Sequence, residues 1–261
     1  MNKKEGVTYR ISHKNINKLN FDSPQNFDSI LFDSNLNCNL HCVYCHNPRD
    51  LEKVNEEDFE RFIETCVKSV KLFQIGCAME PTMDKRMTWF ALKVKNSKAN
   101  PTNTFRLQTN GILLDKHNID HLREAGINRF TISMDTINSE IHKELRGGSD
   151  LSKILKNIEW LKSIWPEACV NFVCTVTTLN LPHLQDLVDF ASKNNINYIS
   201  FRKMFYFPDS KIIKNHDKMK ELFLDNNQYL EKINQLNNNK NVTFFIHDEN
   251  SLENNRNLVK V

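Results

Sequence analysis

The stretch Ser29-Ile30-Leu31-Phe32-Asp33-Ser34 is a short apolar run, and three cysteines follow it in Cys38-Asn39-Leu40-His41-Cys42-Val43-Tyr44-Cys45. The apolar run has the length and composition of a buried β-strand. The three thiols therefore lie on the loop that leaves the first strongly apolar strand of the chain. Such a loop can wrap three sulfur atoms around one metal centre.

The overall composition is that of an ordinary globular chain. It has 261 residues, of which 39% are hydrophobic and 26% charged, with a formal net charge of +3. This length suits one large α/β domain or two small ones. The net charge is too small to favour nucleic acid or a membrane as partner. Because there is neither a membrane-length apolar stretch nor the apolar run of a signal peptide, we expect a cytoplasmic protein.

Short apolar runs alternate with helical patterns along most of the chain. Strands are predicted at 29–34, 72–76, 105–109, 129–134, 169–176 and 197–201, and helices at 55–70, 83–95, 113–125, 151–164 and 181–193. This alternation predicts parallel βα units joined by right-handed crossovers. Six units are fewer than the eight of a closed barrel. We therefore expect an α/β fold, a partial (βα)6 TIM-like barrel with an open side.

The flanking segments are expected to extend this barrel. We predict an N-terminal extension at 1–28, which includes a short edge strand at 7–11, and a barrel domain at 29–207. A C-terminal extension at 208–261 would hold a helix at 218–236 and a late strand at 242–246, and would act as a substrate cap. Ligands of such folds bind at the carboxyl ends of the strands, and the cysteine loop leaves from one of these ends.

The cysteine content favours metal or redox chemistry over a disulfide framework. The chain has seven cysteines, three in the loop and four scattered elsewhere, Cys66, Cys77, Cys169 and Cys174. A structural zinc site needs four ligands, the fourth of which would have to be His41 or His46. An iron–sulfur cubane held by three cysteines leaves one iron open to another ligand, an arrangement that suits catalysis.

The sequence CNLHCVYC resembles the CxxxCxxC signature of radical S-adenosylmethionine (radical SAM) enzymes, including Tyr44 before the last cysteine. The resemblance implies that Cys38, Cys42 and Cys45 bind one 4Fe–4S cluster, whose open iron binds S-adenosylmethionine. One-electron reduction, from a donor such as flavodoxin or ferredoxin, would then yield a 5′-deoxyadenosyl radical that abstracts a substrate hydrogen atom. The cofactor carries this chemistry, and the protein orients it and excludes water.

The resemblance continues at the ends of later strands. Gly76-Cys77-Ala78-Met79-Glu80-Pro81 is similar to the family's glycine-glycine-glutamate-proline turn, although Ala78 and Met79 replace the glycines. The stretch 141–148 resembles the histidine-x-x-x-arginine-glycine element of the molybdopterin-biosynthesis and peptide-maturing branch. The residues that the resemblance assigns to cofactor binding are Tyr44, Glu80, Asn110, Ser133, Asp135, Arg146 and Thr175.

Three further residues are candidates for contact with substrate. Cys77 lies at a strand end, where its thiol could donate a hydrogen atom to a substrate radical or be only a small residue in a tight turn. Arg202 and Lys203 end the sixth predicted strand and could hold an anionic group of the substrate or be solvated surface charges. Because no cysteine follows Cys174, we expect one cluster and no auxiliary cluster domain.

Three functions remain open at this point. The first is a radical SAM enzyme that abstracts hydrogen from carbon of a small molecule or peptide. The second is an activase that installs a glycyl radical in a partner enzyme, because Cys45-His46-Asn47-Pro48 resembles that branch. The third is a zinc-binding module without catalytic activity.

Overall fold

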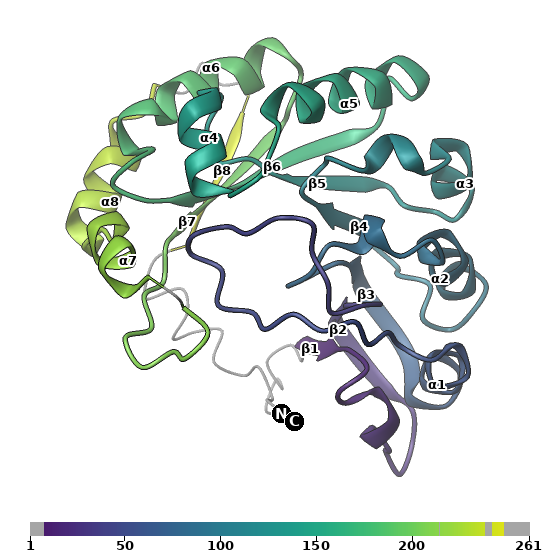
Figure 1. Ribbon diagram of the computed structural model, residues 1–261. Coiled ribbons are helices and arrows are strands. Elements are labelled where there is room, and N and C mark those ends of the chain that lie inside the picture. The colour runs from purple at the N-terminus through teal and green to yellow at the C-terminus, as the bar shows by residue number, and fades with distance from the viewer. Residues whose placement is uncertain (1–7, 214, 238–241, 248–261) are drawn as a thin grey trace, which may run out of the picture.

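The computed structural model describes residues 8–213, 215–237 and 242–247. These residues form one sheet of eight strands in the order β1 to β8, each parallel to the next (Figure 1). The strands are β1 (Thr8–Ile11), β2 (Gln25–Phe32), β3 (Val67–Ile75), β4 (Thr104–Thr109), β5 (Arg129–Ser133), β6 (Cys169–Val176), β7 (Tyr198–Lys203) and β8 (Thr243–His247).

The sheet is curved but does not close, so the predicted open partial barrel is confirmed. It is wider than the six predicted units, because a strand is added at each edge. Residues of the predicted N-terminal extension form β1, which pairs with β2, and residues of the predicted C-terminal extension form β8, which pairs with β7. Both edge strands are short, and both agree with the strands predicted at 7–11 and 242–246.

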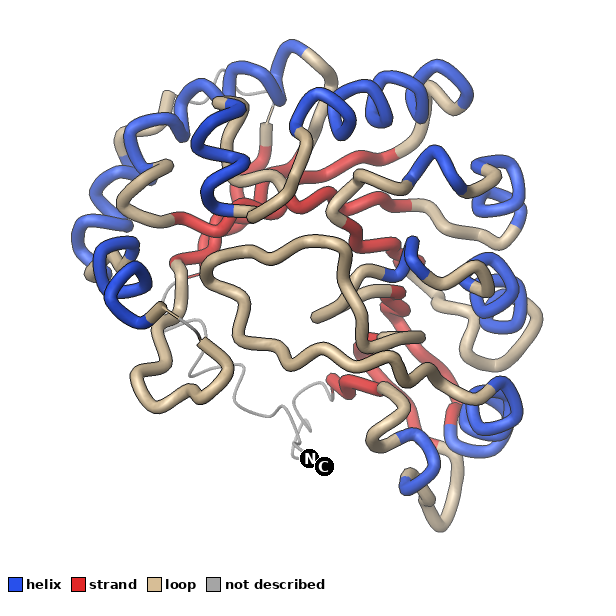
Figure 2. Tube along the Cα trace, in the orientation of Figure 1, coloured by secondary structure: helices blue, strands red, loops and turns tan. Residues whose placement is uncertain are grey.

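Helices cover the convex side of the sheet (Figures 1 and 2). They are α1 (Glu56–Arg61), α2 (Met87–Lys95), α3 (Ile119–Glu124), α5 (Leu151–Ile164), α6 (Leu184–Lys193) and α8 (Asn226–Asn234). Two further helices, α4 (Ser139–Leu145) and α7 (His216–Leu222), lie near the mouth of the barrel and pack in one cluster with the cysteine loop. Two predicted helices are wrong in extent. The helix expected at 55–70 ends in a π-helical turn at Phe62–Cys66, and β3 begins at Val67. The helix expected at 218–236 is divided between α7 and α8, with Asp225 capping the second.

The two faces of the sheet differ in chemistry. Each central strand from β2 to β7 contributes a fully buried phenylalanine, Phe32, Phe73, Phe105, Phe130, Phe172 and Phe201. Because side chains alternate along a strand, the neighbours of these rings lie on the opposite, concave face. Those neighbours include Gln74, Arg106, Thr131, Asn171 and Arg202. The apolar face holds the helices, and the concave face is polar.

The cysteine loop crosses the mouth of the barrel at the carboxyl ends of the strands (Figure 1). Its backbone is paired with the segment after α4, since His41 N–H donates to the Gly147 carbonyl (3.0 Å) and Val43 N–H donates to the Leu145 carbonyl (2.9 Å). A Cβ atom on Gly147 would lie 2.4 Å from the His41 carbonyl oxygen, so the close approach requires glycine. The arginine-glycine stretch therefore braces the cysteine loop.

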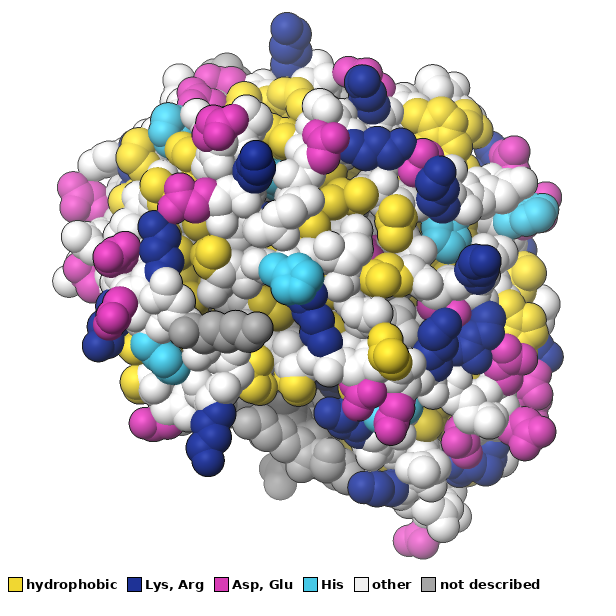
Figure 3. Space-filling model, viewed as in Figure 1, with side chains coloured by type: hydrophobic (Ala, Val, Ile, Leu, Met, Phe, Trp, Pro, Cys, Tyr) yellow, Lys and Arg dark blue, Asp and Glu magenta, His cyan; other side chains and the backbone are white. Residues whose placement is uncertain are grey.

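The face of the molecule over the mouth of the barrel shows no large patch of one charge among the described residues. In the view over the mouth of the barrel, acidic and basic side chains are interspersed (Figure 3). Among the helices of the described ranges, none has the length and apolar character required to cross a bilayer.

Candidate active site

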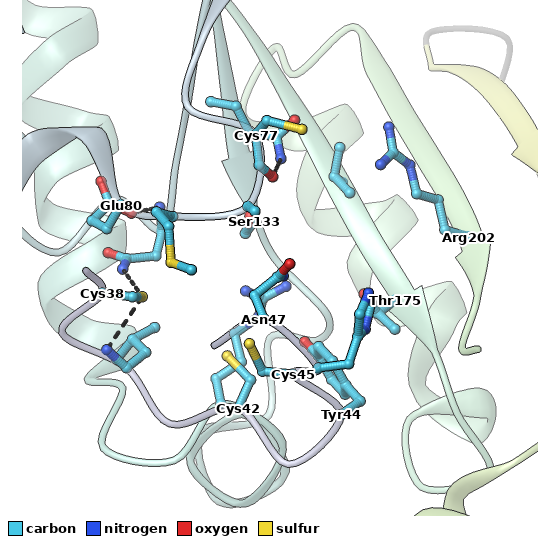
Figure 4. Close-up of a pocket in the computed structure, with 18 of the residues that line it drawn as sticks. Cys38, Cys42, Tyr44, Cys45, Asn47, Cys77, Glu80, Ser133, Thr175 and Arg202 are labelled. Atoms are coloured by element: carbon cyan, nitrogen blue, oxygen red, sulfur yellow. Dashed lines mark hydrogen bonds between the residues drawn. The ribbon is translucent and has the colours of Figure 1, made fainter. Parts of the chain in front are cut away.

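A pocket of about 290 Å³ lies at the carboxyl ends of the strands, beneath the cysteine loop. The loops after β2, β3 and β4 and the strands β5, β6 and β7 contribute to its wall (Figure 4). Of the predicted site residues, all except Asp135 line it: Cys38, Cys42, Tyr44, Cys45, Cys77, Glu80, Asn110, Ser133, Arg146, Thr175, Arg202 and Lys203. Residues far apart in the sequence thus face one cavity.

The three loop cysteines lie along one wall of this pocket, all as free thiols (Figure 4). In the described part of the chain, only His13, Asp50 and Glu52 form a set of three donor atoms within 4.8 Å of one another, so the three sulfurs are not such a set. Sulfurs bound to one tetrahedral zinc ion would be about 3.8 Å apart, given Zn–S bonds of about 2.3 Å. The three sulfurs are thus spread more widely than the ligands of one bound zinc ion.

The three cysteine side chains are half-buried. Burial raises the pKa of the Cys42 thiol to about 12, although the positive charge of Arg146 opposes the shift. Burial also raises the pKa of Cys38, against a hydrogen bond from the Leu40 N–H. Metal ligation requires thiolates, so metal binding here displaces protons from the thiols.

The Glu80 carboxylate joins the loops that follow β3 and β4. Its Oε1 accepts bonds from the Thr82 N–H (3.1 Å) and the Thr109 hydroxyl (2.5 Å), and its Oε2 accepts one from the Asn110 N–H (2.7 Å). Burial raises the pKa of Glu80, while these hydrogen bonds act to lower it. The predicted contact between Glu80 and the amino group of the cofactor would be one more hydrogen bond to this carboxylate, and it stays a prediction.

Asp33 organises the turn between β3 and Glu80, a role that our sequence reasoning missed. Its carboxylate accepts bonds from three successive N–H groups, those of Cys77 (2.8 Å), Ala78 (3.1 Å) and Met79 (3.3 Å). The Arg10 Nε on β1 also donates to it (3.2 Å). This clamp orders a turn that lacks the family's glycines. The available signal was an acidic residue directly after the apolar run of β2.

Asp135 and Arg146 form a buried ion pair. Arg146 donates through Nε and Nη2 to the two carboxylate oxygens, at 2.9 Å each. The Tyr44 hydroxyl also donates to this carboxylate, and so does the Thr175 N–H (2.8 Å). Two of the five Arg146 N–H groups are thus engaged with Asp135, so the cofactor carboxylate that the resemblance assigned to this residue would meet the N–H groups that remain on Nη1 and Nη2. The network ties the cysteine loop to β6.

The remaining candidates also face the pocket, with different partners. Asn110 donates to the Asn39 side chain in the cysteine loop (2.8 Å). Burial raises the pKa of the Cys77 thiol to about 11, so the S–H is retained at neutral pH. The Lys203 ammonium lies over the Phe223 ring, 5.0 Å from its centroid. Ser133 lies at the end of β5 on the pocket wall.

An open parallel barrel with three cysteines on the loop after a strand defines the class of protein. Residues 35–191 match the Radical SAM superfamily, and the chain belongs to this superfamily.

The relatives belong to the molybdopterin-biosynthesis branch that the sequence resembles. A probable GTP 3′,8-cyclase of Methanococcus vannielii is 32% identical over 164 residues, which cover 60% of this chain and 52% of that protein. The GTP 3′,8-cyclase of Clostridium botulinum is 27% identical over 199 residues, 70% of this chain and 61% of that protein. The chain thus spans between half and two thirds of these relatives.

Solved structures share the fold at low identity. Streptococcus suis SuiB bound to S-adenosylmethionine superposes with a TM-score of 0.60 and 19% identity, over 87% of this chain and 51% of that chain. The enzyme anSMEcpe with bound AdoMet gives a TM-score of 0.64 and 21% identity, over 82% of this chain and 57% of that chain.

Proposed function

We propose that the protein is a radical SAM enzyme that abstracts a hydrogen atom from a carbon of a small-molecule or peptide substrate. One electron from a 4Fe–4S cluster would cleave the sulfonium C–S bond of S-adenosylmethionine to methionine and a 5′-deoxyadenosyl radical, which takes the hydrogen atom. The observation that carries the proposal is the set of three free cysteines facing one pocket with Glu80, Asn110, Ser133 and Thr175.

The chain's own residues have distinct roles in this proposal. Cys38, Cys42 and Cys45 would hold the cluster and leave its fourth iron for the cofactor. The Asp135–Arg146 pair and the Gly147 contact hold the cysteine loop over the pocket. Glu80 would accept bonds from the amino group of the cofactor, and the Arg146 N–H groups not bound to Asp135 would meet its carboxylate. Cys77, still protonated, would be able to return a hydrogen atom to a substrate radical.

The names of the similar proteins indicate two classes of substrate. Relatives carry the name GTP 3′,8-cyclase, and SuiB has been solved bound to a precursor peptide. Both kinds of substrate are therefore proposed for this chain. An electron donor of the flavodoxin or ferredoxin kind would supply the reducing equivalent, and a reducing cytoplasmic compartment would keep the cysteines free.

The test is anaerobic reconstitution with iron and sulfide. We expect about four iron atoms per chain, absorption near 400 nm and formation of 5′-deoxyadenosine from S-adenosylmethionine under reduction. About eight iron atoms would contradict the single cluster. Bound zinc with no 5′-deoxyadenosine would contradict the whole proposal. Deuterium transfer from a labelled small molecule or peptide into 5′-deoxyadenosine separates this function from a glycyl-radical activase, which needs a protein partner.

A further inference from the structure

Two arginines on the concave face of the sheet approach one another from different strands. Arg202, near the end of β7, lines the pocket across from Cys38 (Figure 4). Arg106 lies on β4 on the same face as Gln108, which lines the pocket, and one layer deeper because side chains repeat every second residue. The charge of Arg202 acts on Arg106, and both charges act on the Cys77 thiol. Cys77 and Arg202 line the pocket, and Arg106 lies beneath its lining residues, near enough to both for their charges to interact.

These two guanidinium groups have no counterion in the structure as described. Within the described ranges, neither Arg106 nor Arg202 forms an ion pair or a hydrogen bond, and the Nε atom of each is buried without a partner. The nearby cations are satisfied in other ways: Arg10 pairs with Asp33, and Arg129 lies over the Tyr198 ring, 5.4 Å from its centroid. Both side chains are half-buried, and a charge that loses part of its hydration is normally paired.

The acidic groups near the pocket are already occupied. Asp33 binds the turn after β3 and Arg10. Glu80 accepts bonds from Thr82, Thr109 and Asn110, and Asp135 is paired with Arg146. Burial, followed by the charges of Arg202 and Arg129, lowers the pKa of Arg106 to about 10, which still leaves it protonated at neutral pH. The floor of the pocket is thus a positive region that an added anion would stabilise.

We propose that Arg106 and Arg202 form a subsite for a phosphate or carboxylate group of the substrate. Guanidinium groups bind both anions bidentately, and two of them can hold a multiply charged group. An anion held here would fix the substrate with its reacting carbon toward the cluster side of the pocket. The role of this subsite in catalysis rests on the proposed function, but the binding of an anion does not.

The first test is anion binding to the reconstituted protein, measured by calorimetry and thermal shift with inorganic phosphate, pyrophosphate and citrate. Sodium chloride at equal ionic strength is the control for screening. We expect at least one of these anions to bind and to raise the melting temperature. In Arg202→Gln and Arg106→Gln we expect binding at least about 10-fold weaker. Arg123→Gln, which removes an exposed arginine paired with Asp120, should bind as the wild type does.

The ranking of the three anions assigns the group, since tighter pyrophosphate binding indicates a phosphorylated substrate and tighter citrate binding a carboxylate. Binding of none of them, or equal binding in all variants, would overturn the subsite.

The second test is stability without added anion. Arg106→Met should raise the melting temperature, because it removes a half-buried, unpaired charge next to another cation. A fall, with anion binding retained, would show a structural role instead and would also overturn the proposal. Formation of 5′-deoxyadenosine by the wild type is measured separately. Cleavage of S-adenosylmethionine without anion binding would refute only the subsite, and anion binding without cleavage would refute only the proposed function.

Discussion

The two charged regions of the pocket are built in opposite ways. At the cysteine loop, Arg146 has a carboxylate partner in Asp135, and that carboxylate takes two further hydrogen bonds from Tyr44 and Thr175. On the floor, Arg106 and Arg202 lie near each other with buried Nε atoms that lack partners. The first arrangement is complete without a ligand. The second is completed only when an anion is added.

This difference distinguishes an arginine that supports the fold from arginines that would bind a ligand. A buried, paired arginine stabilises the loop it belongs to, since removing one member leaves an uncompensated charge. A half-buried arginine whose Nε atom is buried without a partner lowers stability until a ligand binds, which is typical of a site that trades stability for binding. The same residue type therefore has opposite expected effects on either side of one pocket.

The largest effect is expected for Cys42→Ala. Without this ligand the cluster should not assemble, so iron per chain and 5′-deoxyadenosine should both fall to background. Cys66→Ala is the matched control, because Cys66 is buried in the hydrophobic core away from the pocket. Full iron content with normal 5′-deoxyadenosine in Cys42→Ala would show that the cysteine loop is not the cluster site.

Arg146→Met tests the paired side of the comparison. It leaves Asp135 as an unpaired buried carboxylate, so the free energy of unfolding should fall by about 3–5 kcal/mol. Urea denaturation monitored by circular dichroism measures the free energy of unfolding. In the same assay, Arg106→Met should not lower it. Equal destabilisation by the two substitutions would remove the distinction between the two regions.

His142 lies on α4, buried, with its Nε2 2.9 Å from the Ser149 hydroxyl. Burial, and then the charge of Arg146, lowers its pKa from 6.5 to about 4. Between pH 6.5 and 4 the His142 imidazole is protonated in the unfolded chain and neutral in the folded chain. Above about pH 6.5 the burial of His142 therefore does not lower the free energy of unfolding. As the pH drops toward 4, the free energy of unfolding falls by up to about 3 kcal/mol.

The measurement for His142 is denaturation at a series of pH values. His142→Gln should flatten the curve between pH 6.5 and 4 relative to the wild type. His183→Gln, at a half-exposed histidine beside Asp186, should leave the curve unchanged. An unchanged curve in His142→Gln would assign the acid sensitivity to other groups.

The smallest effect is expected for Asp33→Asn. The amide keeps one hydrogen-bond acceptor for the turn but loses the negative charge that faces Arg10 and the three N–H groups. The free energy of unfolding should therefore fall by about 1–2 kcal/mol. Asp28→Asn, at a surface pair with Lys71, should change stability by less than about 0.5 kcal/mol. If both substitutions have the same effect, Asp33 does not clamp the turn.

Much of the site could be predicted from the local sequence. The spacing of the three cysteines after an apolar run, and polar residues at the ends of successive strands, predicted which loops meet. This worked because parallel strands place their carboxyl ends on one edge of the sheet. The strands at 7–11 and 242–246 were predicted too, but the expected barrel of six units did not include them, and the structure adds them to its sheet as β1 and β8. At Val67 and Val70, apolar spacing that suited a helix belongs to β3.

What the sequence determined by itself is the order of the units, the open parallel fold and the cysteine loop at its mouth. These depend on periodicity and spacing, which are properties of neighbouring residues. Only the tertiary structure decided that Asp135 pairs with Arg146, that Asp33 holds the turn after β3, and that Arg106 and Arg202 share a pocket floor without a carboxylate. Those relations depend on the curvature and stagger of the sheet, which set the distances between side chains from separate strands.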